Sequence, residues 1–267
     1  RESRSTRADW AQGLDVKPFT EDMEYLYFPG CYLCYDGRMK KAAVATAEIL
    51  NKAGVDFGIL GEKESCCGES IRKTGNEEVF KSLARENIKA FIDHGVKRVL
   101  VASPHCYHTF KNEYPEFMVH FEVVHISQFL LELVEAGRLE LPKGRNGGPP
   151  TRVTYHDPCY LGRYNGIYDA PRRVIEATGC ELIEMPRHRE RAFCCGAGGG
   201  RIWMEEGEVT ERPSEARINE AAGLDGVSTF VVACPKDVTM YQDGVKTAGQ
   251  EDRLVVKDRM ELVHEAL

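Results

Sequence analysis

The sequence lacks the features that mark several large classes of protein. It has 35 Lys and Arg against 42 Asp and Glu, a net charge of −7, whereas nucleic-acid-binding domains are usually basic. It contains no uninterrupted apolar run near the roughly 18 residues that predict a membrane-spanning helix. We recognise no secretory signal peptide. We therefore expect no nucleic-acid partner and a cytoplasmic location, with any membrane association made through a partner or an upstream segment.

The sequence also lacks a convincing nucleotide-binding motif. The glycine-rich stretch at residues 196–200 does not form GxGxxG after a strand, so a nucleotide site gains little support. The chain begins with RESRSTRADW rather than with Met, and we therefore expect either a processed chain or part of a longer polypeptide.

Cysteine, by contrast, is abundant, with ten in 267 residues. Two pairs of adjacent cysteines precede a glycine, at 66–68 and at 194–196. Adjacent cysteines rarely bridge each other, because a disulfide demands a specific geometry. Without a secretory signal, this cysteine content favours metal or redox chemistry over a disulfide framework.

The second half of the chain repeats the order and spacing of the first. In both halves 34 residues separate a single cysteine from the adjacent pair, Cys31 from Cys66 and Cys159 from Cys194. Three stretches have counterparts in the same order: 25–33 and 152–161, 66–68 and 194–196, 98–106 and 229–237. Two copies of so long a unit indicate a duplicated domain rather than a solenoid.

Each copy alternates strand and helix patterns. Short apolar runs at 99–101 and 230–232 predict buried strands. Apolar residues recur at helical spacing over 39–50 and 80–91, and Thr74 with Glu77 fits a capping box at the start of the second of these helices. The alternation predicts an α/β fold of two tandem units, each a small, mostly parallel sheet flanked by helices.

The domain organisation follows from the repeat and from the composition between the copies. Glycine and proline concentrate between the two copies, which is typical of a linker. We expect four segments: an exposed lead-in at 1–23, a first domain at 24–142, a linker at 143–151 and a second domain at 152–267.

The repeated cysteines follow predicted strands or lie in the turns beyond them. Because open α/β sheets bind ligands at the carboxyl ends of their strands, three segments of each copy can converge there. Soft thiolates gathered in one place select iron–sulfur clusters, zinc or copper(I). In the Cys-Cys-Gly turns, glycine allows close approach of the backbone, whose N–H groups can offset negative charge on sulfur.

The duplicated cysteine pattern resembles that of the cysteine-rich CCG domain family. VTYHDPCYLGRYNGIYDAPR and FCCGAGGGRIWMEE are most similar to the heterodisulfide-reductase-D-like iron–sulfur reductases of this family. Other members are the catalytic subunit of heterodisulfide reductase, the iron–sulfur subunit of glycolate oxidase and electron-transfer-flavoprotein:quinone oxidoreductase-like proteins. The resemblance covers nearly all of residues 24–267. It implies one or two [4Fe-4S] clusters, either cubane or of the non-cubane type that five cysteines hold.

The sequence departs from the family pattern once in each copy. Ser103 replaces the first cysteine of the last motif in the first copy, and Asp237 replaces the second cysteine in the second copy. The resemblance implies that the remaining cysteines bind the metal: Cys31, Cys66, Cys67 and Cys106, then Cys159, Cys194, Cys195 and Cys234. Four thiolates suffice for a cubane cluster or for zinc in one copy. Alternatively, Cys34 or an oxygen of Ser103 or Asp237 also binds iron, or one copy holds no cluster.

Polar residues beside these cysteines have alternative interpretations. His105 and His108 could complete a zinc site, hydrogen-bond to a cluster or lie on the surface. His156 and Asp157 could tune the potential or relay protons from outside the ligand set. We interpret Lys236 and the carboxylate that follows it as a surface pair.

Three functions are compatible with these patterns. We expect an electron-transfer subunit or domain of a heterodisulfide-reductase-like oxidoreductase, working between a flavoprotein or ferredoxin-type subunit and a quinone or disulfide-type acceptor. A quinone would be reached through a membrane subunit, and ferredoxin clusters would lie elsewhere, because this chain has no C-x2-C-x2-C-x3-C run. The alternative is a zinc-stapled, non-redox interaction module. A dithiol oxidoreductase is weaker, because its usual motif is C-x-x-C.

Overall fold

The computed structural model describes residues 6–141, 149–205, 207 and 209–267. The chain divides into two compact units, Arg1–Leu139 and Glu140–Leu267, which are described separately. Most of the predicted linker at 143–151 lies outside the described residues.

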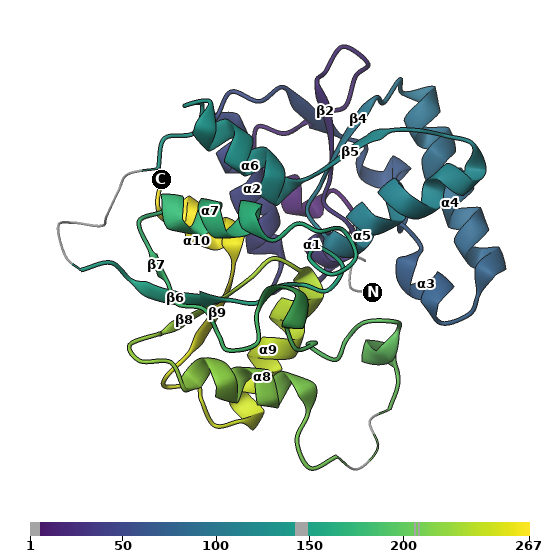
Figure 1. Cartoon of the computed structure of the whole chain (residues 1–267). Coiled ribbons are helices and arrows are strands. Elements are labelled where there is room, and N and C mark those ends of the chain that lie inside the picture. The colour runs from purple at the N-terminus through teal and green to yellow at the C-terminus, as the bar shows by residue number, and fades with distance from the viewer. Residues whose placement is uncertain (1–5, 142–148, 206, 208) are drawn as a thin grey trace. The chain divides into compact units, whose positions relative to one another are not determined.

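The first unit is built on a five-stranded parallel sheet with the order β1-β3-β2-β4-β5 (Figure 1). Its strands are β1 (Lys17–Pro18), β2 (Tyr25–Phe28), β3 (Phe57–Ile59), β4 (Arg98–Val101) and β5 (Glu122–His125). The strand β2 is buried along its whole length, because it pairs with β3 on one edge and with β4 on the other. An apolar run without alternation is typical of such a strand.

Helices follow the strands of the first unit, as the alternating pattern predicts. They are α1 (Cys31–Tyr35), α2 (Lys40–Lys52), α3 (Glu69–Lys73), α4 (Glu77–Asp93), α5 (Pro104–His108) and α6 (Ile126–Glu135), with a π-helical turn η3 (Thr109–Glu113) and a 3-10 turn η4 (Tyr114–Phe117). The predicted capping box at Thr74 is wrong. Asn76 caps α4 by accepting the N–H of Val79, while the Thr74 hydroxyl donates back to the carbonyl oxygen of Ser70 in α3.

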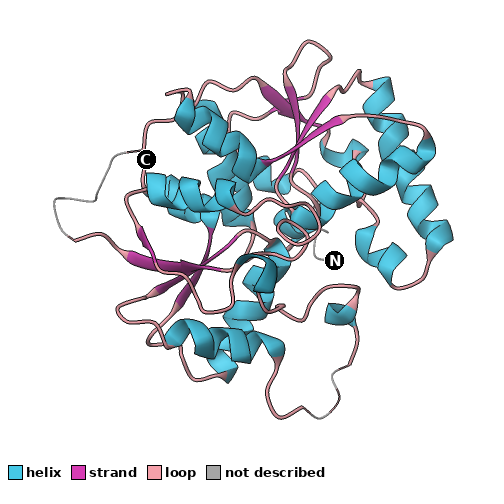
Figure 2. Ribbon diagram, in the orientation of Figure 1, coloured by secondary structure: helices cyan, strands magenta, loops and turns pink. Residues whose placement is uncertain are grey.

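The second unit repeats this plan with a four-stranded parallel sheet in the order β7-β6-β8-β9. Its strands are β6 (Arg152–Tyr155), β7 (Glu181–Leu182), β8 (Thr229–Val232) and β9 (Val255–Asp258), and its helices are α7 (Asp169–Ala177), α8 (Pro213–Ala222), α9 (Pro235–Thr247) and α10 (Arg259–Glu265). Helices α7 and α10 pack together on one face of the sheet, and α8 and α9 pack on the other (Figure 2). The predicted α/β class is therefore confirmed.

The lead-in at the N-terminus differs from the expectation of an exposed segment. Arg7 and Trp10 are each only 4% exposed, and β1 adds a strand to the edge of the first sheet. The Trp10 ring packs edge-on against Tyr27 of β2, with 5.9 Å between the ring centroids. An amphipathic aromatic side chain buried in this way ties the segment to the first unit.

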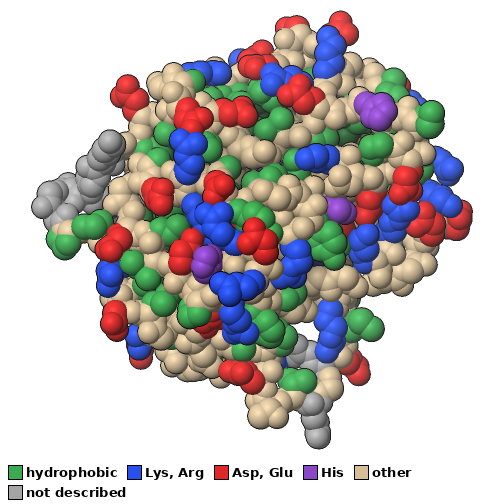
Figure 3. Space-filling model, viewed as in Figure 1, with side chains coloured by type: hydrophobic (Ala, Val, Ile, Leu, Met, Phe, Trp, Pro, Cys, Tyr) green, Lys and Arg blue, Asp and Glu red, His purple; other side chains and the backbone are tan. Residues whose placement is uncertain are grey.

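The charged side chains are distributed as the modest net charge suggests. Lys and Arg are interspersed with Asp and Glu over the face drawn in Figure 3. None of the described helices combines the length and the apolar character needed to cross a bilayer.

Candidate metal centres

The first candidate centre lies at the carboxyl ends of β2 and β4, the neighbouring strands between which the strand order reverses. Cys31 begins α1 just after β2, and Cys106 lies in α5 just after β4. Cys66 and Cys67 come from the loop between β3 and α3. The four thiols are neighbours in the order Cys31, Cys66, Cys67 and Cys106, each close enough to the next to affect a pKa in the row. Folding thus brings together the four predicted cysteines of the first copy.

Crowding and burial raise the pKa of three of these thiols, Cys31, Cys66 and Cys67. The hydrogen bond to Cys66, followed by burial, raises the pKa of Cys31. Cys31 lowers the pKa of Cys66, but the bond to Cys67 and burial raise it more, to about 11. The pKa of Cys67 is raised well above its usual range, first by the hydrogen bond to Cys106. Because thiolates are the ligand form, a metal bound here would displace these protons.

The Cys-Cys-Gly turns have the same local geometry in both units. Gly68 has a φ of +87° and Gly196 a φ of +88°, values that other residues rarely adopt. A Cβ added at Gly68 would lie 2.7 Å from Cδ2 of Phe80. The N–H of Gly68 donates to the Sγ of Cys66 over 3.4 Å, and that of Gly196 donates to the Sγ of Cys194 over 3.3 Å. Glycine therefore allows a turn whose backbone N–H group points at a cysteine sulfur.

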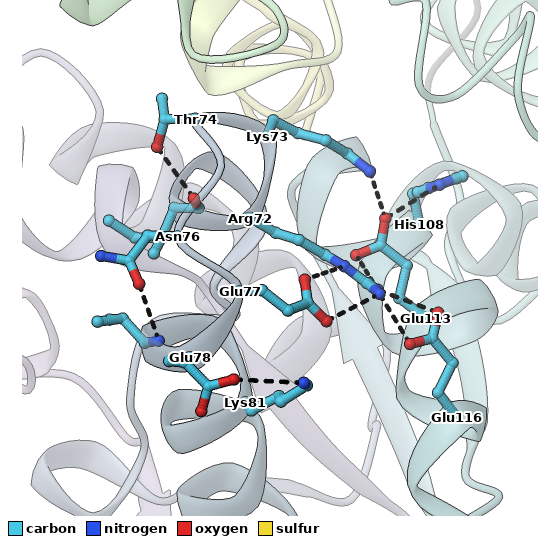
Figure 4. Close-up of polar contacts among 12 residues, drawn as sticks. Arg72, Lys73, Thr74, Asn76, Glu77, Glu78, Lys81, His108, Glu113 and Glu116 are labelled. Atoms are coloured by element: carbon cyan, nitrogen blue, oxygen red, sulfur yellow. Dashed lines mark hydrogen bonds and ion pairs between the residues drawn. The ribbon is translucent and has the colours of Figure 1, made fainter.

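An ion-pair network holds α3, the helix after the first turn, against the segment beyond α5 (Figure 4). Arg72 of α3 pairs with Glu113 at 3.3 Å and with Glu116 at 2.8 Å. It also reaches Glu77 at the start of α4 over 3.1 Å. The Nζ of Lys73 lies 2.6 Å from the second oxygen of Glu113. The network therefore links the two segments that carry the cysteine pair and the last cysteine of the first centre.

The second candidate centre occupies the equivalent place, at the carboxyl ends of β6 and β8. Cys159 follows β6, and its thiol hydrogen-bonds to Cys194, which also bonds to Cys195. The contact with Cys159, and after it the contact with Cys195, lowers the pKa of Cys194. The contact between Cys159 and Cys194 also raises the pKa of Cys159. The N–H of Ala197 donates to the Sγ of Cys195 over 3.4 Å.

The fourth predicted cysteine of the second copy is placed differently from its partner in the first. Cys234 is the N-cap of α9, the position that Ser103 holds before α5. Asp237 stands three residues later, as Cys106 does in the first unit, and its carboxylate hydrogen-bonds to Cys195. Cys234 lies within electrostatic range of Cys159, and its carbonyl oxygen accepts the N–H of Asp237 over 3.0 Å.

The interpretation of Lys236 and Asp237 as a surface pair is wrong. The two residues are only 3% and 2% exposed. The Oδ2 atom of Asp237 lies 3.7 Å from Nε2 of His156 and accepts no hydrogen bond from any residue that the structure describes. Burial raises the pKa of Asp237 to about 7. A buried carboxylate oxygen without a donor, set against the thiols, is a potential ligand.

Buried polar side chains surround the second centre. The Nδ1 atom of His156 accepts a hydrogen bond from Nε of Arg217 over 3.3 Å and lies 3.2 Å from the hydroxyl of Tyr241. Burial lowers the pKa of His156 well below its usual range, so the imidazole is neutral. The two carboxylate oxygens of Asp157 accept hydrogen bonds from the two terminal nitrogens of Arg172, over 2.6 and 2.8 Å. These contacts fix the loop that follows β6.

Three residues with open interpretations lie close to the first centre. Cys34 is fully buried in α1, and burial raises its pKa. His105 is buried, with Nδ1 3.1 Å from an oxygen of Glu69. His108 lies 3.7 Å from Glu113, which makes it part of the network in Figure 4. Both histidines therefore face carboxylates.

Sequence reasoning missed one charged residue at the first centre. The Nη1 atom of Arg7 lies 3.5 Å from the Sγ of Cys31. Arg7 precedes the duplicated region and has no counterpart in the second copy, so neither the repeat nor a motif could have identified it.

The donor set fits an iron–sulfur cluster. Among the described residues, no group of three or more His, Cys, Asp or Glu side chains is arranged as ligands of a single metal ion. A cluster, however, is bound by thiolates on separate irons, and its sulfurs accept hydrogen bonds from backbone N–H groups. Each unit supplies thiols from converging segments together with such N–H donors.

Comparison with known proteins identifies the class to which this fold and these cysteines belong. The family model described as the CCG cysteine-rich domain matches residues 25–111 and 153–236. The chain is therefore a member of the CCG cysteine-rich domain family and carries the domain twice. The resemblance drawn from the cysteine spacing is confirmed.

Curated relatives are oxidoreductases or components of oxidoreductase complexes. EtfAB:quinone oxidoreductase of Syntrophomonas wolfei is 41% identical over 98% of this chain and 38% of its own length. A component of the dihydromethanophenazine:CoB–CoM heterodisulfide reductase of Methanosarcina barkeri is 36% identical over 95% of this chain and 61% of its own length. The chain thus spans less than two thirds of either relative.

Proposed function

We propose that this chain is the cluster-binding, electron-transfer part of a heterodisulfide-reductase-like oxidoreductase. The observation that carries the proposal is the convergence, in both units, of thiols from separate segments at the carboxyl edge of a parallel sheet. A bound [4Fe-4S] cluster, cubane or non-cubane, would supply one-electron transfer at each occupied site. The chain itself would hold the sulfurs, of which four of the eight are buried, and it donates backbone N–H groups to three of them.

The ligands proposed for each centre follow from these contacts. For the first centre they are Cys31, Cys66, Cys67 and Cys106, and for the second Cys159, Cys194, Cys195 and Cys234. Asp237 stands against Cys195 as Cys106 stands against Cys67, which supports its carboxylate as a further ligand of the second centre. A carboxylate among thiolates would make one iron chemically distinct.

The proposed partners are a flavoprotein or ferredoxin-type subunit as electron donor and a quinone or a disulfide as acceptor. The names of the two relatives, which include EtfAB and quinone in one case and a heterodisulfide in the other, support these classes. A quinone acceptor would be reached through a membrane subunit.

The test is iron and sulfide analysis of anaerobically prepared protein, with electron paramagnetic resonance (EPR) spectra. We expect about four irons per occupied centre. The variant Cys66→Ala/Cys67→Ala should lose the iron of the first centre only, and Cys194→Ala/Cys195→Ala that of the second only. Cys180→Ala is the matched control, because Cys180 is half-buried against the core of the second unit and outside both centres.

Two outcomes contradict the proposal. Colourless protein with stoichiometric zinc would favour the non-redox interaction module instead. Iron that survives both double variants would show that the adjacent cysteines do not bind it.

A further inference from the structure

Arg7 places a buried cation beside the first cysteine of the first centre. Its guanidinium donates to Cys31 Sγ over 3.5 Å, to Glu64 Oε1 over 2.7 Å and to the carbonyl oxygen of Ser65 over 3.4 Å. The group also lies over the ring of Phe28, 5.5 Å from its centroid. These contacts come from β2, α1 and the loop before the cysteine pair, so the guanidinium is held in one position.

The charge balance around Arg7 is incomplete on the side of the cysteine. A buried guanidinium needs compensating partners, because desolvation of a charge is costly. Glu64 is one such partner, with its side chain 1% exposed, and it faces Nε of Arg7. The Nη1 edge faces a thiol, which would carry a full negative charge as a thiolate. The ion pair therefore presents its positive end to Cys31.

The second centre has the opposite kind of neighbour. Cys159 corresponds to Cys31, but in the second unit the carboxylate of Asp237 stands against Cys195, and the buried Lys236 beside it lies within electrostatic range of Cys234. The nearby buried guanidinium of Arg217 donates to His156 and pairs with Glu220 at 2.9 Å, rather than contacting a thiol. In the first unit a cation therefore contacts Cys31, whereas in the second a carboxylate contacts Cys195.

We propose that Arg7 raises the reduction potential of the first centre and makes it the stronger electron acceptor of the two. The proposal rests on the proposed function, since it requires a cluster in the first unit. Reduction adds negative charge, which a fixed cation nearby stabilises, and a hydrogen bond to a ligand sulfur acts in the same direction. Arg7 is then a positioning residue that acts on the cluster through Cys31.

The test is an EPR-monitored redox titration of the full chain. Arg7→Met should lower the midpoint potential of the first centre by at least about 59 mV, a tenfold change in a one-electron equilibrium constant. Arg7→Lys, which keeps the charge, should shift it less. Glu64→Gln removes the compensating carboxylate and should raise the potential. The signal of the second centre, assigned with Cys66→Ala/Cys67→Ala, is the internal control and should not move.

The opposite signs separate an electrostatic role from a structural one. Arg7→Met and Glu64→Gln each break the same ion pair, so shifts in the same direction would overturn the proposal. An unchanged potential in iron-loaded Arg7→Met would overturn it as well. If Arg7→Met fails to retain the cluster of the first centre, Glu64→Gln tests the proposal alone. A lowered or unchanged midpoint potential in Glu64→Gln would then overturn it. Wild-type protein without iron in the first unit would refute both this inference and the proposed function there, whereas a null shift in iron-loaded protein refutes the inference alone.

Discussion

At the scale of single residues, the glycine of each Cys-Cys-Gly turn sets the direction of the sulfur-binding backbone. Its left-handed φ lets the N–H group point back at the Sγ of the first cysteine of the pair. A larger residue at this position would carry two costs, the strain of a positive φ and a steric clash with the side chain packed against the turn. The two costs can be separated, because the first unit contains a second glycine with a similar φ and open space around it.

We expect Gly68→Ala to destabilise the protein more than Gly75→Ala. Both residues have a positive φ, +87° and +94°, which costs an alanine about 1–2 kcal/mol. Only at Gly68 does the new Cβ meet a neighbour, Cδ2 of Phe80 at 2.7 Å, and such overpacking typically adds about 1–3 kcal/mol. Urea unfolding of both variants under identical conditions measures the difference. Equal free energies of unfolding would show that Phe80 moves aside without cost.

The same scale shows which site residues a sequence can reveal. The eight cysteines recur at fixed spacing, so their pattern predicted three converging segments in each copy. The role of Asp237 was only partly predictable. The C-x-x-C motif shows that Asp237 replaces a cysteine, but it does not show that the carboxylate is buried against Cys195. Arg7 carried no signal, since a single arginine in an aperiodic segment is normally on the surface.

At the scale of elements, the uniformly apolar strands could be predicted, whereas the start of α4 could not. The apolar runs at β4 and β8 have the length and the uniform hydrophobicity of buried parallel strands, and both strands are paired along both edges. The start of α4 was misjudged, because the sequence offers two competing caps. One is the pattern of Thr74 with Glu77, and the other is Asn76. In the structure the Thr74 hydroxyl donates to the carbonyl oxygen of Ser70 in α3, and Asn76 caps α4 (Figure 4).

Replacing Arg72 by Gln should loosen α3 and lower the free energy of unfolding. Arg72 makes ion pairs with three glutamates and lies over the Phe80 ring, 4.4 Å from its centroid, so we expect a loss of about 1–2 kcal/mol. Arg38→Gln is the control: the Arg38 side chain is 40% exposed and pairs with Asp36, two residues away, so its loss should stay within about 0.5 kcal/mol. Hydrogen exchange should locate the loosening in α3.

The effect of Arg72 should also depend on pH. The hydrogen bond to Arg72 lowers the pKa of Glu116 below its usual value. A carboxylate with a lowered folded-state pKa stabilises the protein above its unfolded-state pKa, and this contribution is lost as the pH falls through the folded-state value. The difference in free energy of unfolding between the wild type and Arg72→Gln should therefore become smaller as the pH is lowered. If this difference in free energy stays constant until the protein unfolds in acid, the stabilisation by Arg72 comes from its packing on Phe80 instead.

At the scale of the whole molecule, duplication has produced two sites with the same scaffold and different donors. The reversal in strand order, the Cys-Cys-Gly turn and the helix after the third repeated segment are common to both units. The donors differ at two equivalent positions, Ser103 and Cys106 in one unit and Cys234 and Asp237 in the other. Since the scaffold is shared, the chemical difference between the centres should follow these side chains and should be transferable.

The double variant Cys234→Ser/Asp237→Cys gives the second unit the Ser-Pro-x-Cys pattern of the first. Because Asp237 contacts Cys195 as Cys106 contacts Cys67, the new cysteine should find a thiol neighbour already in place. We expect the iron content of the chain to be unchanged and the EPR signal of the second centre to move toward that of the first. Cys234→Ser alone, which leaves three of the four proposed thiol ligands at the second centre, is the matched control and should lose iron there. If the double variant loses iron to the same extent, the two positions are not equivalent, and the ligands of the second centre must be sought outside the internal repeat.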